Sequence, residues 1–331
     1  MRAAWSSPTT RITIEEGESH DPGTGPDRYR RALEILRSGD QPMALAAFTF
    51  DVDEPGSVVM IPGTEAPYPD RTPPPPGRIV DDGRKRWWSG FDDALAALGS
   101  GEVEKVVLAR RAVGRFETNL EPASVWRTLV DANPDTYCFL FDGFVGASPE
   151  LLVRVDGDRV QSLALAGTAA TARGLAGEKI ASEHQHTADS VTEALAPITL
   201  GLATTRDLHR FGSLTHVGTW FEGRLQEGFT VLDVLAAIHP TAAVAGTPRD
   251  AAVRLIRRLE EPRGLYCGPV GWFDRDGNGE FAIALRCGHI EGNEIVLHAG
   301  GGLLLGSDRD REWKETELKL RPMLSALGLE G

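Results

Sequence analysis

The strongest constraint on the fold is a series of tight turns between runs of alternating apolar residues. The segment GPVGWFDRDGNGEFAIALRCGHIEGNEIVLHAGGG (268–302) has Asp276-Gly277 at one turn and Gly292-Asn293 at the next. Asp156-Gly157 lies in the same way between ELLVRV and RVQSLALAG. Asp-Gly and related pairs between alternating runs are the strongest short-range signal for a β-hairpin. The sequence therefore predicts extensive antiparallel β-sheet.

Helical periodicity recurs between these hairpins. We expect helices within residues 85–104, 122–133, 182–201 and 249–261, and strands within residues 43–62, 105–117 and 136–148. Residues 16–28, which are polar and rich in Gly and Pro, are typical of a loop or frayed end, and residues 68–78 of a stiff surface connector. No internal repeat and no clear linker divides the sequence. We therefore expect one α+β domain over residues 1–331.

The composition excludes several classes of protein. The chain has 331 residues, of which 41% are hydrophobic and 25% charged, as in a soluble globular protein. A formal net charge of −13 argues against a nucleic-acid-binding protein, which needs a basic surface. No apolar run reaches the roughly 18 residues of a membrane span, and the N-terminus lacks the apolar core of a signal peptide. We expect a cytoplasmic protein that binds neither nucleic acid nor membrane and, because no apolar stripe indicates obligate assembly, a monomer.

The cysteines are Cys138, Cys267 and Cys287, an odd number in apolar contexts without a CxxC pair. This pattern argues against a disulfide framework or a zinc site and favours a reducing compartment.

Several charged residues interrupt segments that otherwise have the pattern of buried strands. Lys105 begins an apolar strand, Glu150 lies between two strands in ASPELL, and Arg286 interrupts FAIALRC. A buried charge is costly unless it is paired or functional, so these positions are candidates for an acid–base site. Each also has a structural explanation when taken singly; Arg286, for example, could pair with a buried carboxylate.

A group of glutamates accompanies the glycine run AGGGLLLGS (299–307). Glu312 and Glu315 share one side of the predicted helix EWKETELK, and Glu183 is at the start of another. On pattern alone a solvated helix face is the simpler interpretation, because Glu315 and Lys319 form an ordinary i,i+4 pair. Read together with Glu183, the same carboxylates could hold a metal ion at a glycine-lined pocket.

Ten ordered motifs over nearly 250 residues resemble those of the chorismate-utilising enzymes, which include isochorismate synthase, salicylate synthase and the large subunit of anthranilate synthase. The motifs are EKVVLAR, GASPELL, LALAGTAATARG, SEH, LTHVGTWFEGRL, HPTAAVAGTPRDAA, GLYCGPVGW, FAIALR, HAGGG and EWKETELKL. The resemblance covers residues 85–331, and residues 1–80 are a more divergent part of the same fold. It implies an anthranilate synthase component I-like fold, in which two large antiparallel sheets face each other across the active site, flanked by helices.

Three positions discriminate between the reactions of this family. Lys105 stands where members that install a hydroxyl group carry lysine and amine-transferring members usually carry Gln. Aminodeoxychorismate synthase has a lysine where this chain has Ala166, so both positions indicate water as the nucleophile. Ala243 stands where salicylate synthases carry Thr. The resemblance therefore implies an isochorismate synthase that acts on chorismate, in siderophore or menaquinone biosynthesis.

The resemblance also implies a role for each candidate residue. Lys105 would activate water for attack at C2, and Glu150 would protonate the departing C4 hydroxyl, with His216 in the same cleft. Mg²⁺ would be held by Glu183 and Glu315, with Glu312 adjacent. The substrate would be bound by a larger set, namely Thr168, Ala243, Tyr266, Arg286, Gly300 and Lys319. A metal ion and fixed cations would allow this acidic protein to bind a dianion.

One position departs from the family pattern. Related enzymes usually carry an acidic residue one helical turn before the metal-binding glutamate, as in KDRxEH, whereas this chain reads KIASEH with Ile180 there. This departure favours weaker metal binding or a rearranged helix. Two alternatives therefore stay open, a salicylate synthase that also eliminates pyruvate and a catalytically impaired homologue.

Overall fold

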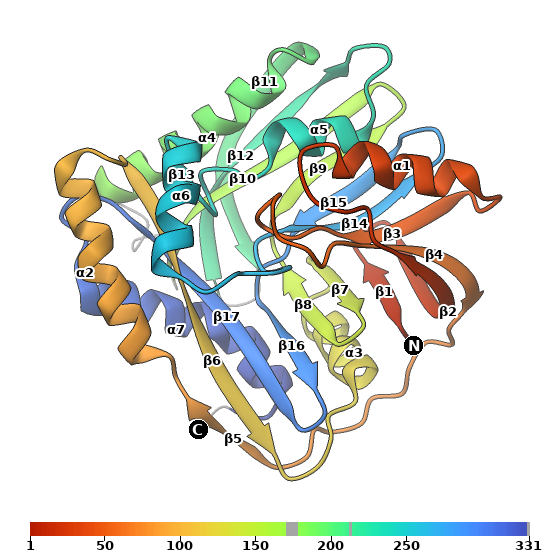
Figure 1. Cartoon of the computed structure of the whole chain (residues 1–331), viewed down its shortest axis with the longest axis horizontal. Helices are drawn as coiled ribbons and strands as arrows, with labels where there is room; N and C mark the ends of the chain where they lie inside the picture. Colours follow the sequence, from red (N-terminus) through yellow and green to blue (C-terminus); the bar gives the residue numbers. More distant parts are fainter. Residues whose placement is uncertain (170–177, 212–213, 330–331) are drawn as a thin grey trace.

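The computed structural model describes residues 1–169, 178–211 and 214–329, and within them the chain forms an antiparallel β-structure surrounded by helices (Figure 1). Seventeen strands are hydrogen bonded into one continuous ladder. The predicted α+β class, with large antiparallel sheets flanked by helices, is confirmed. The ladder has two halves, and the pairing of β1 with β2 joins them.

The first half runs from β5 to β1, with β13 paired to the start of β6. Its strands, in spatial order, are β5 (Gly77–Asp81), β6 (Lys105–Phe116), β17 (Glu294–Leu303), β16 (Cys287–Glu291), β8 (Phe144–Ser148), β7 (Tyr137–Phe141) and β1 (Ala3–Ser6), with β13 at Gly246–Thr247.

The second half runs from β2 to the edge strand β11. Its strands, in spatial order, are β2 (Arg11–His20), β4 (Val58–Glu65), β3 (Met43–Ala47), β14 (Pro269–Asp274), β15 (Gly279–Ile283), β9 (Leu151–Asp156), β10 (Arg159–Ala169), β12 (Leu214–Leu225) and β11 (Thr199–Phe211).

The turns expected from the sequence are present. Asp156-Gly157 joins β9 to β10, Asp276-Gly277 joins β14 to β15, and Gly292-Asn293 joins β16 to β17. The glycine has positive φ in all three turns, at 59°, 92° and 60°. A left-handed backbone is accessible to glycine at little steric cost, which explains why these pairs identified the hairpins.

Helices cover both halves of the ladder (Figure 1). In the first half, α2 packs on β6, α3 on β7 and β8, and α7 on β17, while α6 contacts β6 and β13. In the second half, α4 packs on β10, and α5 contacts β9, β14, α1 and α4. The helices are α1 (Arg28–Ser38), α2 (Arg84–Ser100), α3 (Pro122–Ala132), α4 (Glu178–Leu195), α5 (Val231–Ile238), α6 (Arg249–Leu259) and α7 (Arg309–Ala326).

The structure corrects two of the predicted segments. The helix expected within residues 182–201 is α4, which begins earlier and ends at Leu195, so that Glu183 lies inside the helix rather than at its start. Pro197 follows the end of this helix, and the edge strand β11 begins at Thr199. The loop expected at residues 16–28 includes the end of β2 and the start of α1. Strand β11 and the end of β2 were not recognised because their side chains are largely exposed, so no alternation of buried and exposed apolar residues marks them.

The three cysteines are buried and free, as their sequence contexts indicate. Among the described helices, none combines the length and the apolar character that crossing a membrane requires.

Candidate functional site

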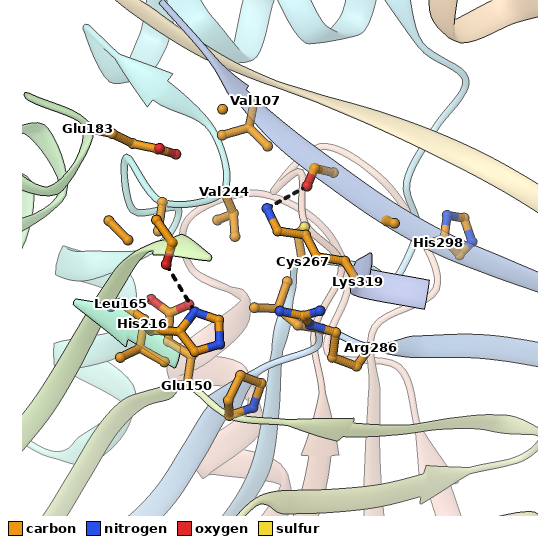
Figure 2. A pocket seen from close by; sticks show the side chains of 18 of the residues that line it. Val107, Glu150, Leu165, Glu183, His216, Val244, Cys267, Arg286, His298 and Lys319 are labelled. Carbon is orange, nitrogen blue, oxygen red and sulfur yellow. Dashed lines mark hydrogen bonds between the residues drawn. The ribbon is translucent and has the colours of Figure 1, made fainter. Parts of the chain in front are cut away.

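A pocket lies between the two halves of the ladder, with walls formed by β6 and β17 on one side and by β10 and β12 on the other (Figure 2). Together with its open mouth it contains about 680 Å³ of empty space. Nine of the twelve candidate residues line it, namely Lys105, Glu150, Glu183, His216, Ala243, Tyr266, Arg286, Gly300 and Lys319. Segments far apart in the sequence thus bring the predicted residues together.

Lys105, the first residue of β6, is fully buried. Its Nζ donates a hydrogen bond to Thr187 Oγ1 at 3.3 Å and lies 3.7 Å from Glu183 Oε1. Burial lowers the pKa of Lys105, and the charge of Glu183 opposes this effect. A lysine with a lowered pKa has a larger neutral fraction near pH 7, which is what a general base requires.

Glu150, between β8 and β9, is the complementary group. Burial raises its pKa to about 7, although the backbone N–H of Leu165 donates to Oε1 at 3.3 Å and the cations Lys105, Lys319 and Arg286 act in the opposite direction. A carboxyl group with this pKa is partly protonated at neutral pH and can donate a proton. The pocket therefore combines an acid and a base whose pKa values move toward neutrality.

His216 on β12 lies beside Glu150, as Figure 2 shows. Its Nδ1 lies 3.2 Å from the Gly167 carbonyl oxygen, which can only accept, so Nδ1 carries the proton in this arrangement. Burial lowers the pKa of His216 to about 3, so the ring is neutral. Thr168 lies opposite His216 in the register of β10 and β12, but its side chain is outside the described part of the structure.

Arg286 faces Glu150 and His216 across the pocket (Figure 2). It is 8% exposed, and its Nη1 has no hydrogen-bond partner within the described residues. Its φ of 50° lies in the left-handed region, as does that of Cys267 at 66°. Such strain in non-glycine residues concentrates at functional sites. A buried guanidinium with an unpaired N–H is suited to bind a carboxylate.

Tyr266 lies beneath the glycine run on β17 and is buried. Its ring stacks on His298, with centroids 4.8 Å apart, and burial raises the pKa of its hydroxyl well above the usual value. A Cβ at Gly300 would lie 3.0 Å from the Tyr266 hydroxyl oxygen. The absence of a side chain at Gly300 thus lets the tyrosine approach the strand.

Lys319 extends from α7 into the pocket beside Arg286 (Figure 2). Its Nζ donates to the Gly300 carbonyl oxygen at 2.8 Å and lies 2.7 Å from Glu315 Oε1. The i,i+4 pair predicted from the sequence therefore exists, and it also orients an ammonium group toward the pocket.

Two of the three candidate metal ligands, Glu183 of α4 and Glu312 of α7, lie against opposite faces of β17. A Cβ at Gly302 would overlap Glu183 Oε1, so this bare glycine provides the space that the carboxylate occupies on the pocket face. A Cβ at Gly301 would lie 3.7 Å from Glu312 Oε2, on the face that packs against α7. Among the described residues, no three His, Cys, Asp or Glu side chains converge to hold a metal ion. Instead, Glu183 and Glu315 each lie against a lysine ammonium group.

The sequence analysis missed three residues at the site. Cys267 and His298 line the pocket, and Thr187 contacts Lys105. His298 belongs to the HAGGG motif, which is a signal for it in the sequence. Thr187 follows Glu183 by one helical turn, and that spacing alone does not single it out. The position that departs from the family pattern, Ile180, is buried and packs against Val217.

The local charge of the pocket differs from that of the whole molecule. Arg286 and Lys319 carry positive charge, as does Lys105 in its protonated form, whereas the carboxyl groups among the lining residues are Glu183 and the partly protonated Glu150. A protein with a net charge of −13 thus presents a cationic pocket, which is suited to a small anionic substrate.

Comparison with known proteins identifies the class to which this fold and this pocket belong. A sequence model of the family described as chorismate binding enzyme matches residues 65–328. The chain belongs to this family.

Individual relatives agree with this assignment. MenF from Mycobacterium tuberculosis (strain H37Rv) is 36% identical over 343 residues, covering 91% of this chain and 90% of that protein. Isochorismate synthase EntC from Escherichia coli (strain K12) is 36% identical over 255 residues, covering 71% of this chain and 65% of EntC.

Solved structures share the fold. DhbC from Bacillus anthracis superimposes with a TM-score of 0.90 at 26% sequence identity, covering 99% of this chain and 96% of that one. Anthranilate synthase component I from Streptococcus pneumoniae, at 22% identity, has a TM-score of 0.71 and covers 96% and 83% of the two chains. The predicted anthranilate synthase component I-like fold is therefore confirmed.

Proposed function

We propose that the protein is an isochorismate synthase, an isomerase that converts chorismate to isochorismate. Water adds at C2 of the ring, the double bonds shift, and the C4 hydroxyl leaves as water. One water is consumed and one is released, so substrate and product are isomers. The observation that carries the proposal is the pairing of Lys105 with Glu150 in one cationic pocket, with pKa values displaced in opposite directions.

Each proton transfer has a candidate residue in this scheme. Neutral Lys105 takes a proton from the attacking water, and protonated Glu150 gives its proton to the departing hydroxyl group. Arg286 and Tyr266 bind the enolpyruvyl carboxylate, and Lys319 lies near the ring carboxylate. His216, Ala243 and Gly300 line the pocket around the ring, and Thr168 is a further substrate-binding residue in this scheme. General acid and general base groups typically contribute about 10²- to 10⁴-fold each to a rate.

We further propose that Mg²⁺ is held by Glu183 and Glu315, with Glu312 adjacent. Carboxylate oxygens are the ligands that Mg²⁺ prefers, and the bare Gly302 lets the Glu183 carboxylate lie close against β17 at the pocket. When bound, the ion would neutralise and orient the ring carboxylate. To bind the ion, both glutamates would have to exchange their contact with a lysine ammonium group for a contact with Mg²⁺. Titration of the protein with Mg²⁺ alone should detect this binding, and Glu183→Gln should weaken it.

The test of the proposed function is a product assay. The protein is incubated with chorismate and Mg²⁺, and the products are separated by chromatography. Isochorismate as the sole product supports the proposal, whereas salicylate with pyruvate would identify a salicylate synthase. Unchanged chorismate at every Mg²⁺ concentration would indicate an inactive homologue. Lys105→Ala should abolish turnover without unfolding the protein, and retained activity would remove Lys105 as the base.

A further inference from the structure

Thr187 is a buried residue of α4 that contacts the proposed base, Lys105, from outside the pocket. It is 0% exposed, and its Oγ1 lies 3.3 Å from Lys105 Nζ and 3.0 Å from the backbone carbonyl oxygen of Glu183. A threonine hydroxyl has one proton and two acceptor sites. Because the Glu183 carbonyl can only accept, the hydroxyl donates its proton there.

The direction of the second hydrogen bond follows from the first. With its proton committed to Glu183, Oγ1 can only accept, so it receives an N–H from Lys105. The opposite assignment, in which the hydroxyl donates to the lone pair of a neutral amine, would leave the backbone carbonyl without this bond. The bond from Thr187 to the helix backbone therefore determines that Lys105 is the donor and Thr187 the acceptor.

The direction of this hydrogen bond affects the orientation of the Lys105 amine. A neutral amine has two N–H bonds and one lone pair in tetrahedral array. With one N–H directed at Thr187 Oγ1, the lone pair cannot point at Thr187 and must lie in another of the tetrahedral directions. Lys105 lines the substrate pocket and Thr187 does not, so turning the lone pair away from Thr187 leaves it free to face the space where the nucleophilic water would lie. A general base works only when its lone pair points at the proton it removes.

We propose that Thr187 is a positioning residue that holds the Lys105 amine with its lone pair toward the substrate pocket. The inference rests on the proposed function, in which Lys105 is the base. Thr187 itself does not line the pocket, so it acts through Lys105 rather than on the substrate.

The test compares Thr187→Val, which keeps the shape and removes the hydroxyl, with Thr187→Ser, which keeps the hydroxyl. We expect Thr187→Val to lower kcat by about 10- to 100-fold, as for a misplaced catalytic group. KM for chorismate should stay within about twofold, because the lost interaction does not bind the ground state. Thr187→Ser should restore most of kcat.

Thr192 on the same helix provides a matched control. Its hydroxyl makes the same bond to the carbonyl of the residue four positions earlier, Ala188, at 2.9 Å, but it is exposed to solvent. Thr192→Val removes the same type of helix contact and should leave kcat and KM unchanged. An equal loss of kcat in both variants would mean that only the helix had been disturbed, and would overturn the proposal.

A second measurement separates this inference from the proposed function. Crystal structures of the wild-type protein and Thr187→Val should show one conformation of Lys105 in the former and displacement or several conformations in the latter. An unmoved Lys105 in the variant would overturn the positioning role, whatever the activity. If the wild-type protein does not convert chorismate, the proposed function fails, and the crystallographic comparison still decides whether Thr187 orients Lys105.

Discussion

At the scale of single residues, the protonation of Glu150 links function to stability. Burial raises its pKa from 4.5 to about 7, so the folded protein holds this proton more tightly than the unfolded chain does. The contribution of the protonated Glu150 to the free energy of unfolding is greatest below pH 4.5 and is lost as the pH rises through 7. The shift corresponds to about 3 kcal/mol of unfolding free energy.

Glu150→Gln should remove the loss of stability that the ionised, buried Glu150 carboxylate causes at high pH. Above pH 7 the variant should be more stable than the wild type by about 3 kcal/mol, because a neutral amide replaces a buried carboxylate. At pH 4 the two proteins should unfold with the same free energy, which provides an internal control. Urea unfolding at both pH values measures the difference, and activity should be lost in the variant. A difference that does not change with pH would contradict the raised pKa.

Arg286 should contribute to substrate binding more than to turnover. Its buried Nη1 lacks a partner among the described residues, so a substrate carboxylate would satisfy it. Replacing Arg286 with Lys removes the planar pair of donors, and we expect KM for chorismate to rise by about 10- to 100-fold, as for the loss of a charged hydrogen bond. Steady-state kinetics of the purified variant measure the change.

Arg110 is a suitable control for this substitution. It is also buried, its Nε and Nη1 have no hydrogen-bond partner in the described part of the chain, and its pKa is lowered to about 10. It packs on Trp313 outside the pocket. Arg110→Lys should leave KM unchanged. Equal increases in KM for the two variants would argue against a specific role for Arg286.

The same residue scale shows what the sequence could and could not reveal. Lys105, Glu150 and Arg286 were visible as charges in apolar segments, because burying a charge is costly enough to require a reason. Thr187 was not visible, since a threonine in a polar helix is unremarkable without its partner 82 positions away. His298 lies in the HAGGG motif, but its stacking on Tyr266 could not be predicted, because it depends on a contact between distant segments.

At the scale of elements, successive glycines of β17 lie on opposite faces of the strand, and only one of these faces lines the pocket. Gly302→Ala should place a methyl group onto Glu183 Oε1 and 3.3 Å from Lys105 Cε, so both side chains must move. Because their positions determine the base, we expect kcat to fall by about 100-fold. Kinetic constants together with the thermal midpoint check the prediction.

The neighbouring glycine supplies the comparison. At Gly301 an added Cβ meets its nearest atom, Glu312 Oε2, at 3.7 Å, which is an ordinary van der Waals distance. Gly301→Ala should therefore retain nearly full activity on the same strand. If both variants were equally impaired, the requirement for glycine at these positions would come from the geometry of the β-strand and not from the pocket.

Elements were predicted well where burial imposed a period and poorly where it did not. Strand β6 and helices α2, α3 and α6 were anticipated within a few residues, because each has one apolar face. Strand β11 was missed because it lies at the edge of the ladder with both faces exposed. In that position the hydrogen bonds to β12 define the strand, and the side-chain pattern carries little information.

At the scale of the whole molecule, Trp5 is one of the residues that connect the two halves of the ladder. Trp5 on β1 in the first half is fully buried, and its Nε1 donates to Glu280 Oε1 on β15 in the second half at 3.2 Å. Its ring stacks on Tyr137 of β7, with centroids 5.8 Å apart. Strands β1 and β2 provide the backbone connection at the same place. Loss of this side chain should therefore weaken both halves together.

Trp5→Ala tests whether the chain unfolds as the single domain predicted from its sequence. We expect a loss of about 3 to 5 kcal/mol, because the substitution leaves a cavity and deprives the buried Glu280 of a hydrogen bond. Far-UV circular dichroism and tryptophan fluorescence should report one shared transition, since β1 and Glu280 link the halves. Trp5→Phe, which keeps an aromatic ring, should cost less. Two separate transitions in the wild type or in either variant would mean that the halves fold independently despite their continuous ladder.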